Sequence, residues 1–137
     1  MNRVIHFEIH SSNPEELAKF YTNVFGWEIK EWEMPGLKLE NRFWYILTAP
    51  KESKDIGING GLVVRKGEKP KGGETVNAFV CTIDVPNVDE YIKKILDNGG
   101  TIALPKMAIP GMAWLAYLKD VEGNIFGIFE SDPSAKN

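Results

Sequence analysis

The sequence predicts an α+β fold: two tandem βαβββ modules whose sheets form a cupped, partly open, eight-stranded mixed β-barrel with the helices outside. Three observations predict it. An alternating strand pattern near the N-terminus is followed by a capped amphipathic helix. The same succession returns 74 residues later, and each half closes with a short strand that contains glycine. Neither half is expected to cover its own sheet well, so pairing of two modules closes the structure.

The first half contains one helix and four strands. Val4–His10 alternates apolar and polar side chains, as a half-buried strand does. Asn13 can cap a helix that begins at Pro14, and Gly26 supplies its end. The apolar face of this helix is formed by Leu17, Phe20, Tyr21 and Val24, and further strands are predicted over Trp27–Glu33, Phe43–Thr48 and Asn59–Arg65.

The second half repeats these signals in the same order. A strand is predicted over Asn77–Val85, a helix capped by Asn87 follows, and Gly99-Gly100 ends that helix. A last strand is predicted over Asn124–Glu130. The helix has an apolar face of Val88, Tyr91, Ile92, Ile95 and Leu96, and identities at the offset of 74 are Ile9/Ile83, Asn13/Asn87, Glu16/Glu90, Lys19/Lys93 and Gly26/Gly100.

The chain therefore divides into module 1 (about residues 1–65), a linker (66–74), module 2 (about 75–132) and a C-terminal tail (133–137), all within a single domain. The linker is rich in glycine and lysine. A solvated connector is the favoured interpretation of such a charge run, and a basic binding loop is the alternative.

Composition excludes several classes of protein. With 16 basic and 19 acidic residues the net charge is −3, so there is no overall field to attract nucleic acid. No segment approaches the 18 apolar residues that a membrane span needs, and no signal peptide is apparent. The lone Cys81 cannot form an intrachain disulfide, which fits a cytoplasmic protein. Its alternation with Phe79 and Ile83 predicts a buried, inert thiol rather than a nucleophile.

The polar face of the first strand supplies the candidate functional residues. It carries His6, Glu8 and His10. Because polar groups in concave sites orient ligands, His6 and His10 are predicted to contact a ligand. His6 and Glu8 are the candidates for acid–base catalysis, with a solvated or salt-linked Glu8 as the alternative.

Four tryptophans are many for a chain of this length. Trp27 follows the first helix and is predicted to pack in the core. Trp44 and Trp114 are the candidates for walls of the cup, where an indole can stack on a flat ligand. Packing in the core is the alternative for both.

Several motifs together resemble the vicinal oxygen chelate superfamily, which includes glyoxalase I, bleomycin-resistance proteins and extradiol dioxygenases. They span essentially the whole chain: Val4–Ile9, Phe20-Tyr21, Val24–Trp27, Pro105–Gly111 and Asp120–Gly127. The sequence is most similar to small glyoxalase-like proteins of unassigned substrate. The resemblance implies the paired-module fold predicted above, a small-molecule ligand and homodimerisation; it leaves open whether a cup forms within one chain or by exchange of modules.

The resemblance also implies His or Glu metal ligands on the first and last strands of each module. His6 matches the first position. The other three fall at Gly60 or Gly61, near Ala78 or Val80, and at Gly127. Since a mononuclear site usually needs three protein ligands, the usual metal site is expected to be absent and no cofactor is expected.

A divalent metal held by other residues stays open as an alternative. His6, Glu8 and His10 share one strand face, and Glu130 would be a further ligand. Alternation from Gly127, however, places Glu130 on the opposite face unless a bulge intervenes.

Two classes of function follow. The favoured one is a small-molecule binding protein similar to glyoxalase and bleomycin-resistance proteins, without the usual metal and with aromatic ligands among the candidates. The alternative is a metal-dependent lyase, isomerase or dioxygenase that uses His6 and non-standard ligands. Metal-free acid–base catalysis by His6 and Glu8 is a third, weaker hypothesis.

Overall fold

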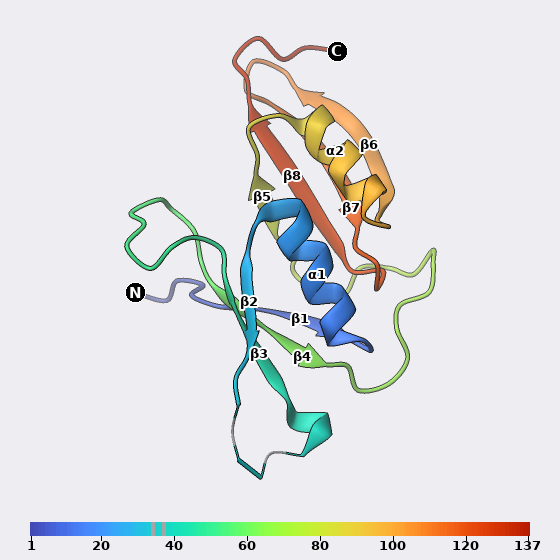
Figure 1. The fold of residues 1–137 in the computed structure, drawn as a ribbon. Coiled ribbons are helices and arrows are strands. Elements are labelled where there is room, and N and C mark those ends of the chain that lie inside the picture. The colour runs from blue at the N-terminus through green and yellow to red at the C-terminus, as the bar shows by residue number, and fades with distance from the viewer. Residues whose placement is uncertain (34, 37) are drawn as a thin grey trace. The chain divides into compact units, whose positions relative to one another are not determined.

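The computed structural model describes residues 1–33, 35–36 and 38–137. The chain divides into two compact units, Met1–Lys69 and Pro70–Asn137, and the boundary falls inside the linker predicted over residues 66–74 (Figure 1). The described residues form eight strands in two separate four-stranded sheets, one in each unit. No helix among the described residues is long and apolar enough to cross a membrane.

The first unit is a four-stranded mixed sheet covered on one face by a helix. Strand order is β1-β4-β3-β2, with β1 parallel to β4 and the other pairs antiparallel. The helix packs against β1, β2 and β4. The elements in chain order are β1 (Phe7–Ser11), α1 (Pro14–Phe25), β2 (Glu28–Glu31), the 3-10 turn η1 (Leu39–Asn41), β3 (Phe43–Leu47) and β4 (Gly60–Val64).

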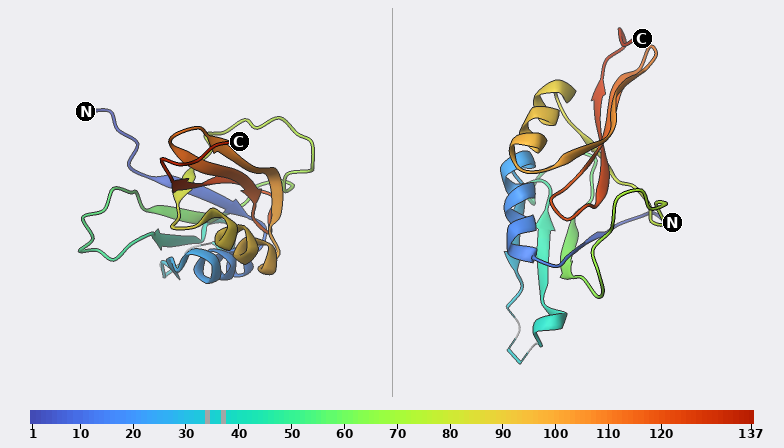
Figure 2. Two further views of the ribbon diagram at one scale, coloured as in Figure 1. Left: turned by 90° about the horizontal axis from the view of Figure 1, so that it is seen from above. Right: turned by 90° about the vertical axis from the view of Figure 1, so that its right-hand side faces the viewer.

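The second unit repeats this order of elements. The strand order of its sheet is β5-β8-β7-β6. As in the first unit, one pair is parallel, here β5 with β8, and the other pairs are antiparallel. Its helix lies on one side of the sheet against β6, β7 and β8 (Figure 2). The elements are β5 (Thr82–Asp84), α2 (Val88–Asp97), β6 (Thr101–Ile109), β7 (Ala113–Lys119) and β8 (Ile125–Ser131). The predicted pair of βαβββ modules is confirmed.

Equivalent asparagines begin the two helices, as the repeat predicts. The Asn13 side chain accepts a hydrogen bond from the Glu16 N–H at 3.4 Å, and Asn87 accepts one from the Glu90 N–H at 2.8 Å. Each bond satisfies one of the amide donors that a helix start leaves without a partner. At the other end of α1, Gly26 has a φ of 73°, a left-handed conformation that favours glycine.

The chain packs closely around Gly100, which lies just after α2. Its N–H donates to the Ile95 carbonyl at 2.9 Å. A Cβ built on Gly100 would lie 2.5 Å from Cγ2 of Ile95 and 2.7 Å from the carbonyl oxygen of Lys119. Glycine is therefore required here by a close approach of side chain and backbone.

Apolar side chains of each helix bury against the sheet of the same unit. The predicted face of α1 is buried, and Trp27 stacks on Tyr21 with ring centroids 5.1 Å apart. The core position predicted for Trp27 is thus confirmed. In the second unit Leu96 is 43% exposed, contrary to its predicted place on the apolar face. The buried residues of the two units include Leu17, Phe20, Tyr21, Val24, Ile46 and Leu62, and Val88, Ile95, Ala116, Leu118 and Ile128.

The first strand of each unit is shorter than the sequence predicts. β1 begins at Phe7 instead of Val4, because its partner β4 begins at the residue paired with Phe7, namely Gly60. Val4 and Ile5 are consequently exposed. In the second unit β5 covers only Thr82–Asp84 of the strand predicted over residues 77–85.

The C-terminal tail predicted over residues 133–137 is attached to the second unit. Ala135 is 2% exposed, and its carbonyl accepts a hydrogen bond from the N–H of Gly111 at 2.9 Å. The segment around Ala135 therefore packs on the connection between β6 and β7.

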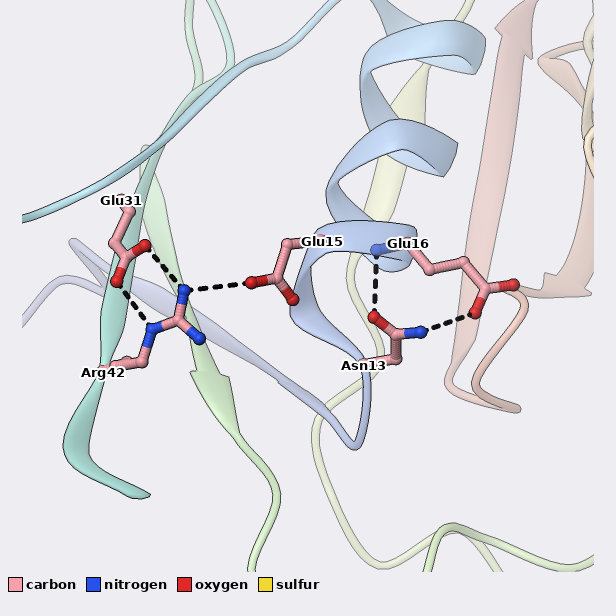
Figure 3. A network of polar contacts seen from close by, with 5 residues as sticks. All are labelled: Asn13, Glu15, Glu16, Glu31 and Arg42. Carbon is pink, nitrogen blue, oxygen red and sulfur yellow. Dashed lines mark hydrogen bonds and ion pairs between the residues drawn. The ribbon is translucent and has the colours of Figure 1, made fainter. Parts of the chain in front are cut away.

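An arginine links three elements of the first unit (Figure 3). Nε and Nη2 of Arg42 donate to the two carboxylate oxygens of Glu31 at 2.6 and 2.7 Å, and Nη2 also donates to Glu15 at 2.9 Å. The guanidinium carbon lies 4.6 Å from the centroid of the Trp44 ring. This two-pronged geometry joins the first turn of α1 to β2 and to the residue before β3.

We expect Arg42→Gln to raise the pKa of Glu31 towards its ordinary value. The hydrogen bonds from Arg42 hold that pKa below its usual range. A lowered folded-state pKa contributes stability that is present above the unfolded-state pKa and lost as the pH falls through the folded value. The variant should therefore lose this part of the acid dependence of unfolding. Carbon-13 NMR titration of the Glu31 carboxyl measures the shift; an unchanged pKa would contradict the pairing.

Candidate functional site

The face of the first sheet turned away from α1 is here called the open face. Register defines its members, because residues paired directly across neighbouring strands share a face. Glu8 pairs with Gly61, which pairs with Tyr45, which pairs with Lys30. The open face also holds His10 and Val63, Phe43 and Glu28, with Leu47 at the end of β3.

Phe43 and Gly61 occupy the centre of the open face. A Cβ built on Gly61 would lie 2.5 Å from Cζ of Phe43 and closer still to Cε2. The edge of the phenyl ring therefore occupies the space where a side chain of residue 61 would begin. An aromatic ring covering a glycine in a neighbouring strand is a recognised way to pack a sheet at a position without a side chain.

Trp32 adjoins this ring at the end of β2. Its N–H donates to the Phe43 carbonyl at 2.8 Å, which continues the β2–β3 ladder by one pair and places Trp32 on the open face. The two rings meet edge to face, with centroids 6.1 Å apart and planes at 75°. Trp32 is 56% exposed. Sequence reasoning missed this residue, since alternation over Glu28–Glu31 is weak.

Glu8 and His10 lie on the edge strand of the same face. His10 Nε2 is 3.1 Å from Oε1 of Glu8, and each side chain is about half exposed. This agrees with the predicted polar face, and it matches the salt-linked alternative for Glu8. His6 precedes the first residue of β1 and is exposed. The roles in ligand contact and catalysis predicted for these three residues stay predictions.

The second unit has an equivalent arrangement. Gly127 on β8 pairs with Tyr117 on β7 and with Thr82 on β5. A Cβ on Gly127 would lie 2.9 Å from Oγ1 of Thr82 and 3.3 Å from Cε1 of Tyr117. In both units, then, an aromatic ring or neighbouring side chain fills the space beside a glycine on the face opposite the helix. The repeated Gly–Tyr pairing of Gly61 with Tyr45 and Gly127 with Tyr117 was not anticipated from the sequence.

Trp44 lies on the covered side of its sheet, which is the core alternative of the sequence analysis. It pairs with Leu62 on the helix-covered face and is 4% exposed. Its neighbours in β3, Phe43 and Tyr45, hold the open face instead. Because every residue of β3 is apolar or aromatic, alternation alone does not tell which face is covered.

Trp114 shares the helix-covered face of its own sheet, in the alternation that includes Ala116 and Leu118. Its Nε1 donates to Asp132 at 2.9 Å, and Nζ of Lys106 lies 4.4 Å from the ring centroid. Hydrogen bonds from Ser134, and to a smaller extent the one from Trp114, lower the pKa of Asp132. These contacts agree with the core alternative for Trp114, and a role in ligand binding stays a prediction.

Two further expectations concern single residues. Cys81 is exposed, contrary to its predicted burial. Its carbonyl accepts the N–H of Gly127 at 2.9 Å, but β5 begins only at Thr82, and the neighbouring Phe79 is itself 96% exposed. Glu130 faces α2, as alternation predicts, and its Oε2 accepts the N–H of Val88 at 2.7 Å. Glu130 therefore caps the start of α2 instead of reaching the face of Gly127.

The residues at the expected ligand positions do not fit the usual metal site. Two of the positions, Gly61 and Gly127, have no side chain, and the space where one would begin is taken by Phe43 in the first case and crowded by Thr82 in the second. Ala78, near the third position, offers no donor atom. Within residues 1–33, 35–36 and 38–137, no group of three or more His, Cys, Asp or Glu side chains is arranged to hold a metal ion.

Comparison with known proteins agrees with the fold. No family model matches the chain. A glyoxylase-like domain-containing protein from Didymella fabae is 28% identical over 125 residues, which cover 88% of each chain. A mutant of glyoxalase I from Zea mays superposes with a TM-score of 0.71 at 18% identity, over 95% of this chain and 46% of that one.

A mutant of the fosfomycin resistance protein FosX from Listeria monocytogenes has a TM-score of 0.67 at 17% identity, over 96% of this chain and 92% of its own. That mutant is complexed with Mn(II) and 1S,2S-dihydroxypropylphosphonic acid. The chain thus has a paired βαβββ fold like that of glyoxalase I and FosX. Its fold is that of the vicinal oxygen chelate superfamily, which confirms the resemblance at the level of the fold.

Proposed function

We propose that the protein binds a small molecule, in the manner of glyoxalase-like and bleomycin-resistance proteins, without the superfamily's usual metal site. The observation that carries the proposal is the pair of covered glycines. Gly61 and Gly127 stand where ligating side chains are expected, and Phe43 and Tyr117 rings lie beside them. In the first unit such a ring supplies apolar contact area for a ligand, and Glu8 and His10 on the edge strand of the same sheet are available to orient it.

The alternative is a metal-dependent lyase, isomerase or dioxygenase. Its support is the Mn(II) complex of the FosX mutant together with the presence of His6 at one expected ligand position. In this alternative the metal would act as a Lewis acid on a substrate with neighbouring oxygens. One imidazole does not hold a divalent ion selectively, so the ligand set would have to be completed by residues outside the expected positions. Cytoplasmic location and homodimerisation stay predictions.

Metal analysis separates the two classes. Protein purified without chelator is expected to contain Mn, Fe, Ni and Zn each well below one equivalent, measured by inductively coupled plasma mass spectrometry. Near-stoichiometric metal that is lost in His6→Ala and kept in His10→Ala would establish the alternative. Should the metal persist in both variants, the assignment of His6 as a ligand would be wrong.

A ligand screen tests binding itself. We would measure the shift in Tm with neutral, anionic and cationic small molecules, with and without aromatic rings, because a ligand that binds only the folded state raises Tm. At least one class is expected to raise Tm, and calorimetric titration of its members should saturate at a fixed stoichiometry. A protein that responds to no member of the screen would leave the binding proposal without support.

A further inference from the structure

The Trp32–Phe43 corner of the open face indicates the class of ligand, an inference that rests on the proposed function. The two rings stand at 75° to each other, so a flat molecule laid against the face of one ring turns its own edge towards the other ring. Trp32 is 56% exposed although it is the largest side chain on this face. The Cε2–Cζ edge of Phe43 fills the space beside Gly61, and so the position of this ring is fixed by the fold itself. Rigid aromatic surfaces of this kind bind at low cost in conformational entropy.

The charges on the strands of the open face favour a cation. Glu8 pairs with Gly61 and therefore lies one strand spacing, about 4.8 Å, from the backbone that the Phe43 ring covers. One carboxylate oxygen of Glu8 contacts His10. On the opposite edge Lys30 and Glu28 pair with each other at 2.7 Å. On these strands the carboxylates of Glu8 and Glu28 therefore stand against the ammonium group of Lys30.

Arg65, the residue after β4, directs its charge to the backbone of β1. Its Nη2 donates to the His10 carbonyl at 2.7 Å, and its N–H donates to the Ser11 carbonyl at 2.8 Å. The guanidinium is thus bound to the backbone of the edge strand beside His10, which pairs with Val63, the partner of Phe43. Glu8, by contrast, pairs with the glycine that Phe43 covers, so its carboxylate is the charge expected to act on the corner.

The aromatic rings act in the same direction. The faces of Trp and Phe rings carry a negative quadrupole potential that attracts cations. An anionic ligand would meet the negative ring faces with the Glu8 carboxylate nearby. We propose that this corner binds a planar aromatic cation, a flat ring system carrying a protonated amine or a ring-nitrogen charge.

Isothermal titration calorimetry with three probes tests the proposal. Proflavine is a planar aromatic cation, 2-anthracenecarboxylate a planar anion and 1-adamantylammonium a cation without a flat ring. Proflavine is expected to bind at least about tenfold more tightly than either of the others, since only it uses both the ring contact and the charge.

Substitutions at two residues locate the site. Trp32→Ala is expected to weaken proflavine binding about tenfold, and Trp32→Phe, which keeps a ring, should lose less. Glu8→Gln should weaken proflavine about two- to fivefold and leave 2-anthracenecarboxylate no weaker. Ile56→Ala removes a fully exposed apolar side chain from the segment between β3 and β4 of the same unit and serves as the control, with no change expected. Circular dichroism checks that each variant is folded.

Arg65→Gln tests which charge acts on the corner. Because the guanidinium is bound to the β1 backbone, this variant is expected to change proflavine binding less than Glu8→Gln does. A larger change in Arg65→Gln, in either direction, would show that Arg65 sets the charge of the site. That result would overturn the preference for a cation.

The outcomes distinguish this inference from the proposed function. Proflavine binding that is unchanged in both Trp32→Ala and Glu8→Gln overturns the corner as its site. Tighter binding of 2-anthracenecarboxylate or 1-adamantylammonium overturns the ligand class while leaving the proposed small-molecule binding supported. If the protein binds none of the three probes but another class of molecule raises its Tm in the screen, only the inference about the ligand class is rejected. If no compound binds in either experiment, both the inference and the proposed function are rejected.

Discussion

Replacing Trp44 by alanine is expected to lower the free energy of unfolding by about 3–5 kcal/mol, the usual cost of truncating a buried Trp or Phe. Trp44 is 4% exposed between β2 and β4, paired with Glu31 on one side and Leu62 on the other. Alanine leaves a cavity on the helix-covered face and also removes the ring beneath the Arg42 guanidinium. Urea unfolding followed by circular dichroism gives the difference.

Trp32→Ala is the matched control, since it makes the same substitution on the other face of the same sheet. Its 56% exposure predicts a loss below about 1 kcal/mol. Trp44→Ala is therefore expected to reduce mainly the stability of the protein, whereas Trp32→Ala is expected to reduce mainly ligand binding. An equal loss of stability in both would contradict the assignment of these residues to opposite faces.

Gly100→Ala is expected to lower the free energy of unfolding by about 1–3 kcal/mol, as overpacking of a well-packed site does. The new methyl group would meet Cγ2 of Ile95, a fully buried side chain, and the backbone carbonyl of Lys119. Neither neighbour can move without displacing α2 or β7. Thermal or urea unfolding of the variant measures the effect.

Gly72→Ala is the matched control for this position. A Cβ at Gly72 has no neighbour within 4 Å, and its φ lies outside the left-handed range. Its stability should therefore stay within about 0.5 kcal/mol of the parent. A variant at Gly100 that behaves like the one at Gly72 would show that the α2–β6 connection is looser than described.

The repeat and the helices could be predicted because their signals are local. An asparagine cap three residues before a glutamate, a helical apolar period and a glycine at the end each act within a few residues of chain. The equivalent caps at Asn13 and Asn87 and the left-handed Gly26 follow directly from them. The order of elements in both units needs no further information.

The open face could not be assigned because its signal depends on pairing between strands. β3 reads Phe-Trp-Tyr-Ile-Leu, so either alternating set could face the helix. Only the register with Leu62 and Gly61 puts Trp44 in the core and its neighbours outside. Two adjacent glycines within a predicted strand, Gly60 and Gly61, indicate that other groups approach the strand closely. In the structure Phe7 approaches Gly60 and Phe43 approaches Gly61.

The parallel pairing of first and last strands has a consequence for the order in which the chain can fold. β1 is joined to β4 and β5 to β8, so each sheet acquires its outer strand only when its last strand is in place. The start of α2 depends on the last strand in the same way, because Glu130 on β8, 42 residues further along the chain, accepts the hydrogen bond from the N–H of Val88. During synthesis from the N-terminus, the first unit can be completed once residue 64 is available, whereas the second must wait for residue 131.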